Sequence, residues 1–454
     1  MLLLAGTGLV AGVALLLVAD AWPRVGLIAG YPLILLAATK FRQRASAAAL
    51  SGSVDSQIVF EVAIYGLIAV IALMATLRLR PRIQRPSLME ALLYSFAAFA
   101  LASTVWSAVP TITLVRSVQL CILVWFTVVA LRWLGTEGVR QALTMSLVFY
   151  VLVFSLIAAT IPGTATVWSE RRFGWFAMHP ILCGTLAGLG IVLLVAEGLF
   201  VPRQRWTRLG RFPILLLLLP LAVVLVAAWS RGPLFATLGA CAALILRRGL
   251  RPWIVWVPLG VSLAVAGSLL LMGAGNVIVQ LAERSAGSDS PVVRFLTRDE
   301  SFNYLSTLGG RTVLWGIISE LFFQRPLTGW GYNASRGLLP GAMGWASYAH
   351  NALAQTLLDL GLIGTVLLWF AVLRSFFADI LEPRWTGTPE GSARAFVFGC
   401  LTMLILISVV SETFTGVPGY ELLVVLTCVL VSGRDRVAGS GLRARGPRGG
   451  RSTM

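Results

Sequence analysis

Charged side chains are scarce along most of this chain. Only 12% of its 454 residues are charged, whereas 57% are hydrophobic. Long apolar runs recur throughout, such as VFEVAIYGLIAVIALMATL and ILLLLLPLAVVLVAAW. Each approaches the roughly 20 residues that an α-helix needs to cross a bilayer. The shortage of charge excludes a soluble globular protein, and the sequence predicts an all-α, polytopic membrane protein.

Metal-binding and disulfide patterns are also missing. The cysteines have no spacing typical of a zinc site or a disulfide framework. They all fall within apolar runs, at Cys121, Cys183, Cys241, Cys400 and Cys428. The sequence has no Asp-x-Asp motif and no glycine-rich phosphate loop with a lysine. We therefore expect no metal site and no cofactor, so that any phosphate has to be bound by arginine.

Acidic residues are few, and the basic excess is unevenly placed. The chain has 36 Lys and Arg against 19 Asp and Glu, a net charge of +17. The basic residues cluster between apolar runs, at 78–85, 203–211, 247–251 and in the C-terminal tail. Because Lys and Arg collect in cytoplasmic loops, this excess indicates membrane topology and not a nucleic-acid-binding surface.

The basic clusters predict one orientation. If 78–85 is cytoplasmic, ten alternating spans place every later basic cluster on the same side. These spans lie near 88–105, 112–131, 142–161, 178–200, 213–229, 233–246, 253–272, 350–373, 395–411 and 421–432. Three earlier segments, 2–19, 25–39 and 57–77, are also apolar, and the first is expected to be a membrane helix, not a removed signal peptide. About twelve spans are expected if two of them cross, with the N-terminus inside, and about thirteen if all three cross.

This topology divides the chain into four parts. Residues 1–272 form a transmembrane bundle and 273–349 a large outer loop. Residues 350–432 form the C-terminal membrane helices, and 433–454 form a basic, disordered cytoplasmic tail. Within the loop, the apolar spacing predicts an interfacial amphipathic helix from Thr312 to Phe323. A loop of this length is typical of a lid or a binding segment.

Polar residues gather on the outer side of the predicted topology. Both histidines of the chain lie there, and so do several arginines and one glutamate. The outer set is Trp106, Ser107, Arg171, Arg172, His179, Ser230, Arg231, His350, Ser411 and Glu412. We therefore expect the functional site on this face.

Two outer arginines stand where a structural role alone does not require a cation. Arg231 lies between two apolar runs in AAWSRGPLF, and an arginine within hydrocarbon costs at least about 2.5 kcal/mol. Arg311 begins the helix in GGRTVLWG, where a cation opposes the helix macrodipole. A guanidinium group binds phosphate through a planar fork of donors. Both residues are candidates for binding an anion.

His350 begins a polar stripe that enters the membrane, in SYAHNALAQTLLDLG. Asn351, Gln355 and Asp359 recur every four residues and therefore share one face of a helix. A stripe facing lipid would be costly, so it must face the bundle interior or a wet cavity. His350 is either a packing residue or a general base. His179, in AMHPILCG, is more typical of a structural histidine at a helix start.

Several of these segments resemble the O-antigen ligase and polymerase superfamily of bacterial envelope glycosyltransferases. The resembling segments are WSRGPL, GGRTVLWGIISELFFQRPLTGWGYN and AHNALAQTLLDLGLIGTVLL. TVWS near residue 106 and RRFGWFAMHPILCG resemble earlier signatures of the family, although Ile181 stands where the family more often has asparagine. The resemblance extends from about 85 to 432.

The resemblance implies an enzyme that uses an undecaprenyl-pyrophosphate-linked glycan donor at the periplasmic face of the bacterial inner membrane, without metal. Arg231 and Arg311 would bind the pyrophosphate, and His350 would activate the acceptor hydroxyl so that the anomeric carbon is inverted. Further candidate substrate contacts are Arg172, His179, Asn351, Gln355 and Glu412.

Three functions remain open. The segments GRTVLW and AHN resemble those of O-antigen and exopolysaccharide polymerases more closely, which favours a polymerase. A ligase would instead pass the glycan to lipid A-core in lipopolysaccharide. A lipid-linked glycan flippase or transporter is the alternative of another class, although such proteins tend to show paired repeats with midplane charges. For this family, a flippase and a chain-length regulator are the expected partners besides the glycan substrates and membrane lipids.

Overall fold

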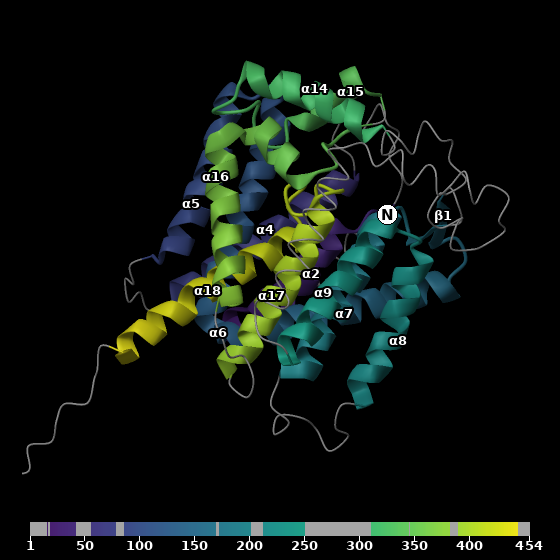
Figure 1. The fold of residues 1–454 in the computed structure, drawn as a ribbon, viewed down its shortest axis with the longest axis vertical. Helices are drawn as coiled ribbons and strands as arrows, with labels where there is room; N and C mark the ends of the chain where they lie inside the picture. Colours follow the sequence, from purple (N-terminus) through teal and green to yellow (C-terminus); the bar gives the residue numbers. More distant parts are fainter. Residues whose placement is uncertain are drawn as a thin grey trace, which may run out of the picture.

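The computed structural model describes residues 16, 19–41, 56–78, 86–168, 172–200, 212–249, 310–344, 346–381 and 389–443. They are mostly α-helical and form one bundle (Figure 1). Among them, six helical stretches are long and apolar enough to cross a membrane: Ser56–Arg78, Leu88–Trp106, Pro110–Thr160, Pro180–Phe200, Ala352–Ala378 and Gly391–Ser408. The prediction of a helical membrane-embedded protein is confirmed. The number of spans stays a prediction, since the expected spans 2–19 and 253–272 lie largely outside the described residues.

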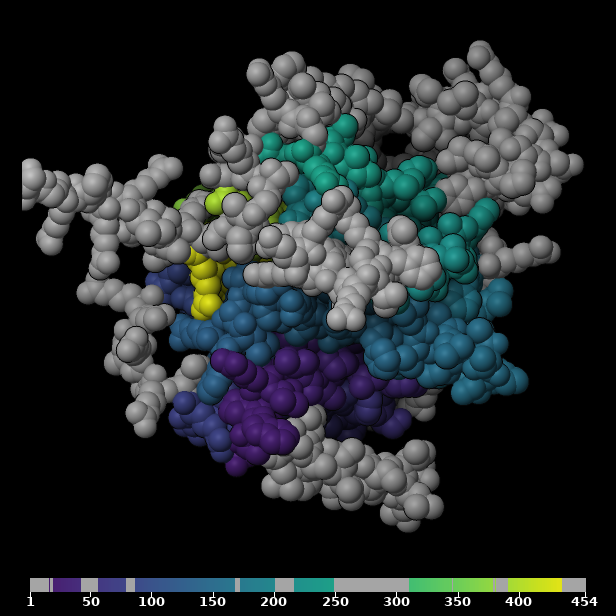
Figure 2. Space-filling model, turned by 90° about the horizontal axis from the view of Figure 1, so that it is seen from below, coloured from purple at the N-terminus to yellow at the C-terminus, as the bar shows by residue number. Residues whose placement is uncertain are grey.

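The N-terminal helices pack around α6 (Pro110–Thr160). They are α2 (Pro23–Ala38), α4 (Ser56–Arg78) and α5 (Leu88–Ala102), and the short 3-10 helix η1 (Ser103–Trp106) follows α5. Seen from below in Figure 2, the purple N-terminal helices lie directly against the blue α6. The start of α5 is fixed by a capping box, in which Ser87 and Glu90 each bond the other's backbone N–H.

Two predicted spans, 112–131 and 142–161, are both contained in α6. Gly135 divides this 51-residue helix, because its φ of 69° and ψ of 174° are not helical. Only glycine adopts such a φ without a steric penalty. The bend falls in the connection between these two spans, which the alternating topology predicts to be cytoplasmic, and Arg140 there pairs with Glu137 and Glu197. The two spans thus meet at a bend and not at an open loop.

A β-hairpin follows α6 and was not predicted. Strand β1 (Ala165–Trp168) pairs antiparallel with β2 (Arg172–Trp175), with Ala165 opposite Trp175. The Trp175 side chain is fully buried against the bundle. Strands of four residues carry too little periodicity to be recognised in an apolar sequence.

The middle helices pack closely through small residues. They are α7 (Pro180–Phe200), α8 (Phe212–Ala227), α9 (Arg231–Gly249) and α17 (Pro389–Ser408). A Cβ on Gly188 of α7 would collide with the side chain of Thr237 on α9. Such close approach through glycine is typical of helix packing in membranes, where dispersion contacts replace the hydrophobic effect.

Two short helices lie at the end of the bundle where α16 begins (Figure 1). They are α14 (Arg311–Gln324) and α15 (Ser335–Ala342), and α14 coincides with the helix predicted for Thr312–Phe323. Helix α16 covers Ala352–Leu381, and the last helix, α18, covers Tyr420–Arg443. The tail predicted to be disordered from 433 therefore begins inside a helix, and 444–454 lie outside the described residues.

Helix α16 is interrupted at Gly361, which has a φ of 62° and a ψ of −161°. The interrupted turn bonds to the loop that follows α14: Leu362 N–H donates to the Pro326 carbonyl at 2.8 Å, and Gly331 N–H donates to the Asp359 carbonyl at 2.8 Å. A Cβ on Gly361 would collide with the backbone of Leu327. Backbone groups freed where a membrane helix is interrupted need protein partners, and here the loop provides them.

Candidate functional site

Three helices begin on the same side of the bundle, close to one another. Arg231 is the first residue of α9, Arg311 is the first residue of α14, and α16 begins directly after His350 and Asn351. The N-terminus of a helix carries a partial positive charge and points backbone N–H groups outward. A cation there opposes the helix macrodipole, and the guanidinium group together with the backbone N–H groups can bind an anion.

The turn after α17 brings the starts of α9 and α16 together. Asn351 Nδ2 donates to the Val409 carbonyl at 3.0 Å, which ties the start of α16 to this turn. A Cβ on Gly232 would lie 3.2 Å from Val410 Cγ2, so the start of α9 also contacts the turn. Glu412 is two residues further along. Segments that are far apart in the sequence therefore meet around residues 409–412.

His350 faces Glu412 across this turn. The distance between His350 Nδ1 and Glu412 Oε2 is 3.4 Å, and the side chains are 27% and 21% exposed. When Nδ1 faces a carboxylate, an imidazole can accept a proton at Nε2, and the carboxylate stabilises the cation that forms. The pair has the chemistry of a general base with its orienting acid, within reach of solvent.

Glu412 is held in its ionised form. Burial by itself would raise the pKa of this carboxyl, but the hydrogen bond and charge of His350 and the charge of Arg311 lower it below its usual value. Trp315, one turn after Arg311 in α14, donates from Nε1 to the Ala349 carbonyl at 2.9 Å, so the start of α14 lies beside the residue that precedes His350. The structure thus brings together three of the sequence-predicted site residues.

Backbone strain also marks this face. Among the described residues, four other than glycine have a positive φ: Phe176, Trp229, Asn333 and His350. His350 has a φ of 49°, and Trp229, with a φ of 46°, stands two residues before Arg231. Conformations of this kind are costly and gather at functional sites, where surrounding contacts enforce them.

The polar stripe of α16 faces the protein interior. This was one of the two orientations predicted from the sequence, the other being a wet cavity. Asn351 caps the helix, because its Oδ1 accepts the Ala354 N–H at 2.9 Å. Gln355 is fully buried and donates to Ser335 Oγ and Asp359 Oδ2, both at 2.6 Å. The Asp359 carboxylate in turn accepts the N–H groups of Asn333 and Ser335.

These contacts give Gln355 a positioning role. Its Oε1 also accepts the Ala349 N–H at 2.8 Å, so the amide fixes the backbone immediately before His350. Binding of substrate by Asn351 and Gln355 stays a prediction. The geometry assigns both to the support of His350.

The two remaining candidates, Arg172 and His179, lie in β2 and directly before α7. His179 is exposed and caps α7, since its Nδ1 accepts the Ile181 N–H at 3.3 Å. A Cβ on Gly184, in the first turns of α7, would lie 3.2 Å from Pro233 Cβ, so α7 and α9 begin side by side. Arg172 is buried in β2, opposite Trp168. Substrate contact by either residue stays a prediction.

Sequence reasoning missed a buried polar cluster within the membrane. Glu61 of α4 pairs with Arg116 of α6, and Gln119 bonds to both, at 2.8 Å to Arg116 Nη1 and 3.0 Å to Glu61 Oε1. All three side chains are buried. The cost of placing a charge inside an apolar run could have drawn attention to Glu61 and Arg116.

Sequence reasoning also missed a half-buried arginine near His350. The Arg336 guanidinium lies 5.5 Å from the ring centroid of Tyr348, two residues before His350. The Tyr348 ring in turn lies beside Gly416, four residues after Glu412.

No group of three or more His, Cys, Asp or Glu side chains that could hold a metal ion occurs in the part of the chain that the structure describes.

Comparison with known proteins supports the resemblance drawn from the motifs. Residues 214–369 match the family described as O-Antigen ligase, a stretch that contains Arg231, Arg311 and His350. The exopolysaccharide production protein ExoQ of Rhizobium meliloti (strain 1021) is 25% identical over 305 residues. The aligned stretch is 63% of this chain and 65% of that relative's length, just under two thirds. The likeness to the O-antigen ligase and polymerase superfamily is thereby confirmed.

Proposed function

We propose that this membrane-embedded relative of the O-antigen ligases and polymerases is a metal-independent, inverting glycosyltransferase. It transfers a glycan from undecaprenyl pyrophosphate to a sugar hydroxyl at the periplasmic face, in the synthesis of a surface polysaccharide. One observation carries the proposal: two helices that begin with arginine, Arg231 and Arg311, start beside the His350–Glu412 pair.

The arginines and helix starts bind the donor pyrophosphate. Two guanidinium forks and two positive helix ends match the charge and the paired oxygens of a pyrophosphate. Negative charge on the bridging oxygen grows as the glycosyl bond breaks, and fixed cations stabilise it most at that moment. Arg231 and Arg311 thus supply the positive charge that stabilises the leaving pyrophosphate, a role that a metal ion can also fill.

His350 activates the acceptor. The imidazole takes the proton of the acceptor hydroxyl while that oxygen bonds to the anomeric carbon from the side opposite the pyrophosphate. The bond between this carbon and the pyrophosphate oxygen breaks, and its electron pair leaves with the pyrophosphate. Direct displacement inverts the anomeric carbon. Ionised Glu412 orients the imidazole and stabilises the imidazolium that forms.

Polymerisation is the favoured use of this chemistry. The name of the relative, exopolysaccharide production protein, supports a polymer as the product. The second candidate is ligation to lipid A-core, which the description of the matching family, O-Antigen ligase, favours. Both reactions need the same donor and the same outward-facing site.

The test is transfer by the purified protein in lipid vesicles. With lipid-linked repeat units alone, we expect a ladder of longer lipid-linked saccharides, unchanged by EDTA and with the anomeric configuration inverted by NMR. Transfer to lipid A-core without a ladder would identify a ligase. Loss of activity in EDTA that magnesium restores would contradict metal-independent chemistry, and the absence of transfer to both acceptors would contradict the proposal.

The periplasmic face is tested separately. Reporters fused after Arg140, Arg208 and Arg248 are expected to report cytoplasm, and those after Ser169 and Ser288 the outside. All five positions depend on one alternating topology, so a reversal at any of them contradicts the assignment.

A further inference from the structure

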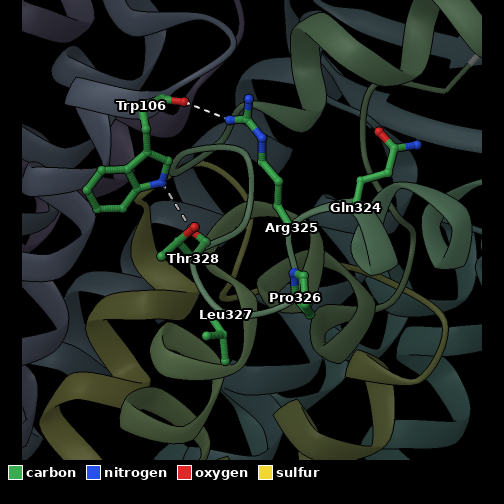
Figure 3. Close-up of a pocket in the computed structure, with 6 residues that line it drawn as sticks. All are labelled: Trp106, Gln324, Arg325, Pro326, Leu327 and Thr328. Atoms are coloured by element: carbon green, nitrogen blue, oxygen red, sulfur yellow. Dashed lines mark hydrogen bonds between the residues drawn. The ribbon is translucent and has the colours of Figure 1, made fainter.

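A groove lies on the outer face at the C-terminal end of α14. Its walls come from η1 and from the loop that crosses α16 at the Gly361 interruption. It is lined by Trp106, Gln324, Arg325, Pro326, Leu327 and Thr328 (Figure 3). None of these residues belongs to the site around His350.

The groove has a fixed guanidinium group. Arg325 donates from Nη1 to the Trp106 carbonyl at 3.0 Å, and Trp106 Nε1 donates to the Thr328 carbonyl at 3.3 Å (Figure 3). The Arg325 guanidinium also lies 4.2 Å from the ring centroid of Trp330, a cation–π contact. Arg325 is exposed, and within the described ranges no carboxylate pairs with it. It therefore presents a positioned cation to an anion from outside.

An apolar stripe continues from the groove along α16. Ile363 N–H donates to the Leu327 carbonyl at 3.2 Å, which joins the groove to this helix. Leu327 is 60% exposed, and Ile363, Val366 and Phe370 on α16 are 42%, 61% and 50% exposed. Positions three, four and seven residues apart share one helix face. A cation above an exposed apolar stripe complements a lipid that has an anionic head.

The groove is well separated from the donor pyrophosphate site. Arg311 begins α14 and Arg325 directly follows its last residue, so the rise of the helix places the two residues about 20 Å apart. One pyrophosphate cannot contact both. The outer face thus has two separate positions for an anionic group.

Polymerisation needs a second lipid pyrophosphate, since the growing chain and the incoming unit are both lipid-linked. The acceptor brings a hydroxyl to His350, but its own pyrophosphate bond stays intact. That pyrophosphate must therefore be held away from His350 by about the length of its saccharide. The Arg325 groove has a positive charge that suits a pyrophosphate, and an exposed apolar stripe that suits a lipid chain. It also lies at the required distance from the donor site.

We propose that the groove at Trp106 and Gln324–Thr328 binds the pyrophosphate of the lipid-linked acceptor, whose polyprenyl chain lies along Ile363, Val366 and Phe370. This inference rests on the proposed polymerase function. Arg325 binds the acceptor head, and Arg231 and Arg311 bind the donor head.

Acceptor kinetics test the proposal. The donor carries a blocked terminal hydroxyl, so that it cannot serve as acceptor, and the acceptor is offered either lipid-linked or as the same saccharide without lipid. Arg325→Ala should raise KM for the lipid-linked acceptor about tenfold and leave kcat, the donor KM and the unlinked acceptor unchanged. Arg248→Ala, an exposed arginine at the far end of α9, is the matched control and should change none of these.

A second variant separates loss of binding from loss of structure. Gln324 is exposed at the groove, so Gln324→Trp should fill the groove without removing the Arg325 contacts and should raise the same KM. The proposal is overturned if KM rises equally for the lipid-linked and the unlinked acceptor. It is also overturned if KM for the lipid-linked acceptor rises in neither variant. A rise that disappears when phosphatidylglycerol is left out of the vesicles overturns it as well, because the groove then binds an ordinary phospholipid.

Binding without turnover distinguishes this proposal from the proposed function. Native mass spectrometry with undecaprenyl-pyrophosphate-linked saccharide whose terminal hydroxyl is blocked should show two bound lipids on the wild-type protein and one on Arg325→Ala. Failure of the wild type to transfer glycan would contradict the function even if two lipids bind. A single bound lipid on an active wild type would overturn only the acceptor groove.

Discussion

Ionisable groups occur in two regions of this protein with different surroundings. Within the membrane, Glu61 and Arg116 are bonded to each other and to Gln119, and their side chains are only 5% and 9% exposed. His350 and Glu412, the outer pair, lie beside the start of α16, approach to 3.4 Å and are 27% and 21% exposed. His350 also has a strained backbone, with a φ of 49°.

The difference shows that a charge in a membrane span does not by itself mark a functional site. The inner cluster of Glu61, Arg116 and Gln119 bonds its own members and joins α4 to α6, and its charges lie close to Tyr348, two residues before His350. The outer pair is partly exposed and lies beside the starts of three helices. Both regions look equally unusual in an apolar sequence, so substitutions are needed to distinguish them. Substitutions around His350 and Glu412 should have large effects on transfer, whereas substitutions in the inner cluster should affect stability alone.

Loss of His350 should have the largest effect on transfer. His350→Ala removes the general base and should lower kcat about 10²–10⁴-fold, whereas binding of the lipid pyrophosphate donor should persist because the arginines hold it. Initial rates and donor binding by the purified variant measure both quantities. Arg248→Ala, at the far end of α9, is the control and should stay close to wild type. A His350 variant within about threefold of wild type would leave this residue a packing role.

Loss of either anion-binding arginine should have the next largest effect. Arg231→Ala and Arg311→Ala each remove charge from the leaving pyrophosphate and should lower kcat about 10²–10³-fold with normal protein levels. Lysine should substitute poorly, because it supplies a point charge and not a bidentate fork. Full activity of both Arg231→Lys and Arg311→Lys would show that only net charge matters at this face.

Glu412→Gln should have a moderate effect, because the amide still fills the space but no longer stabilises the imidazolium. We expect kcat to fall about tenfold. The lowered pKa of Glu412 predicts a pH signature in stability as well. A carboxyl whose pKa is lower in the folded state stabilises the fold above its unfolded pKa of about 4.3, and this contribution is lost as pH falls through the folded pKa.

The melting temperatures of wild type and Glu412→Gln measured against pH check this signature. They should differ at neutral pH and converge below about pH 4. A difference that is constant over the whole range would mean that the charge of Glu412 does not contribute.

Substitutions in the inner cluster should have the smallest effect on transfer. Arg116→Leu leaves Glu61 buried without its partner and should destabilise the fold by about 3–5 kcal/mol. The double substitution Glu61→Leu with Arg116→Leu removes both charges and should recover most of this stability. Thermal unfolding gives the stabilities, and the rate per folded molecule should stay near wild type in both variants. A large loss of turnover in the stable double variant would show that the two regions act together.

The sequence by itself determined the helical, membrane-embedded architecture. Apolar runs of spanning length must form helices in a bilayer, where each backbone group needs an internal partner, and this requirement is local. The helix α14 was predictable from its apolar spacing for the same reason. Arg231, Arg311 and His350 could be chosen as site residues because a charge or an imidazole beside hydrocarbon is costly wherever the chain later folds.

Only the tertiary structure decided which of these residues meet. Glu412 becomes the partner of His350 because the turn after α17 packs against the starts of α9 and α16, contacts between segments distant in the sequence. In the same way, Gln355 turned out to support the backbone before His350, and Gly361 pairs α16 with the loop after α14. The cost of burying a polar group is set by its own chemistry and can be read from the sequence. The partner that offsets the cost depends on long-range packing, which residue spacing does not encode.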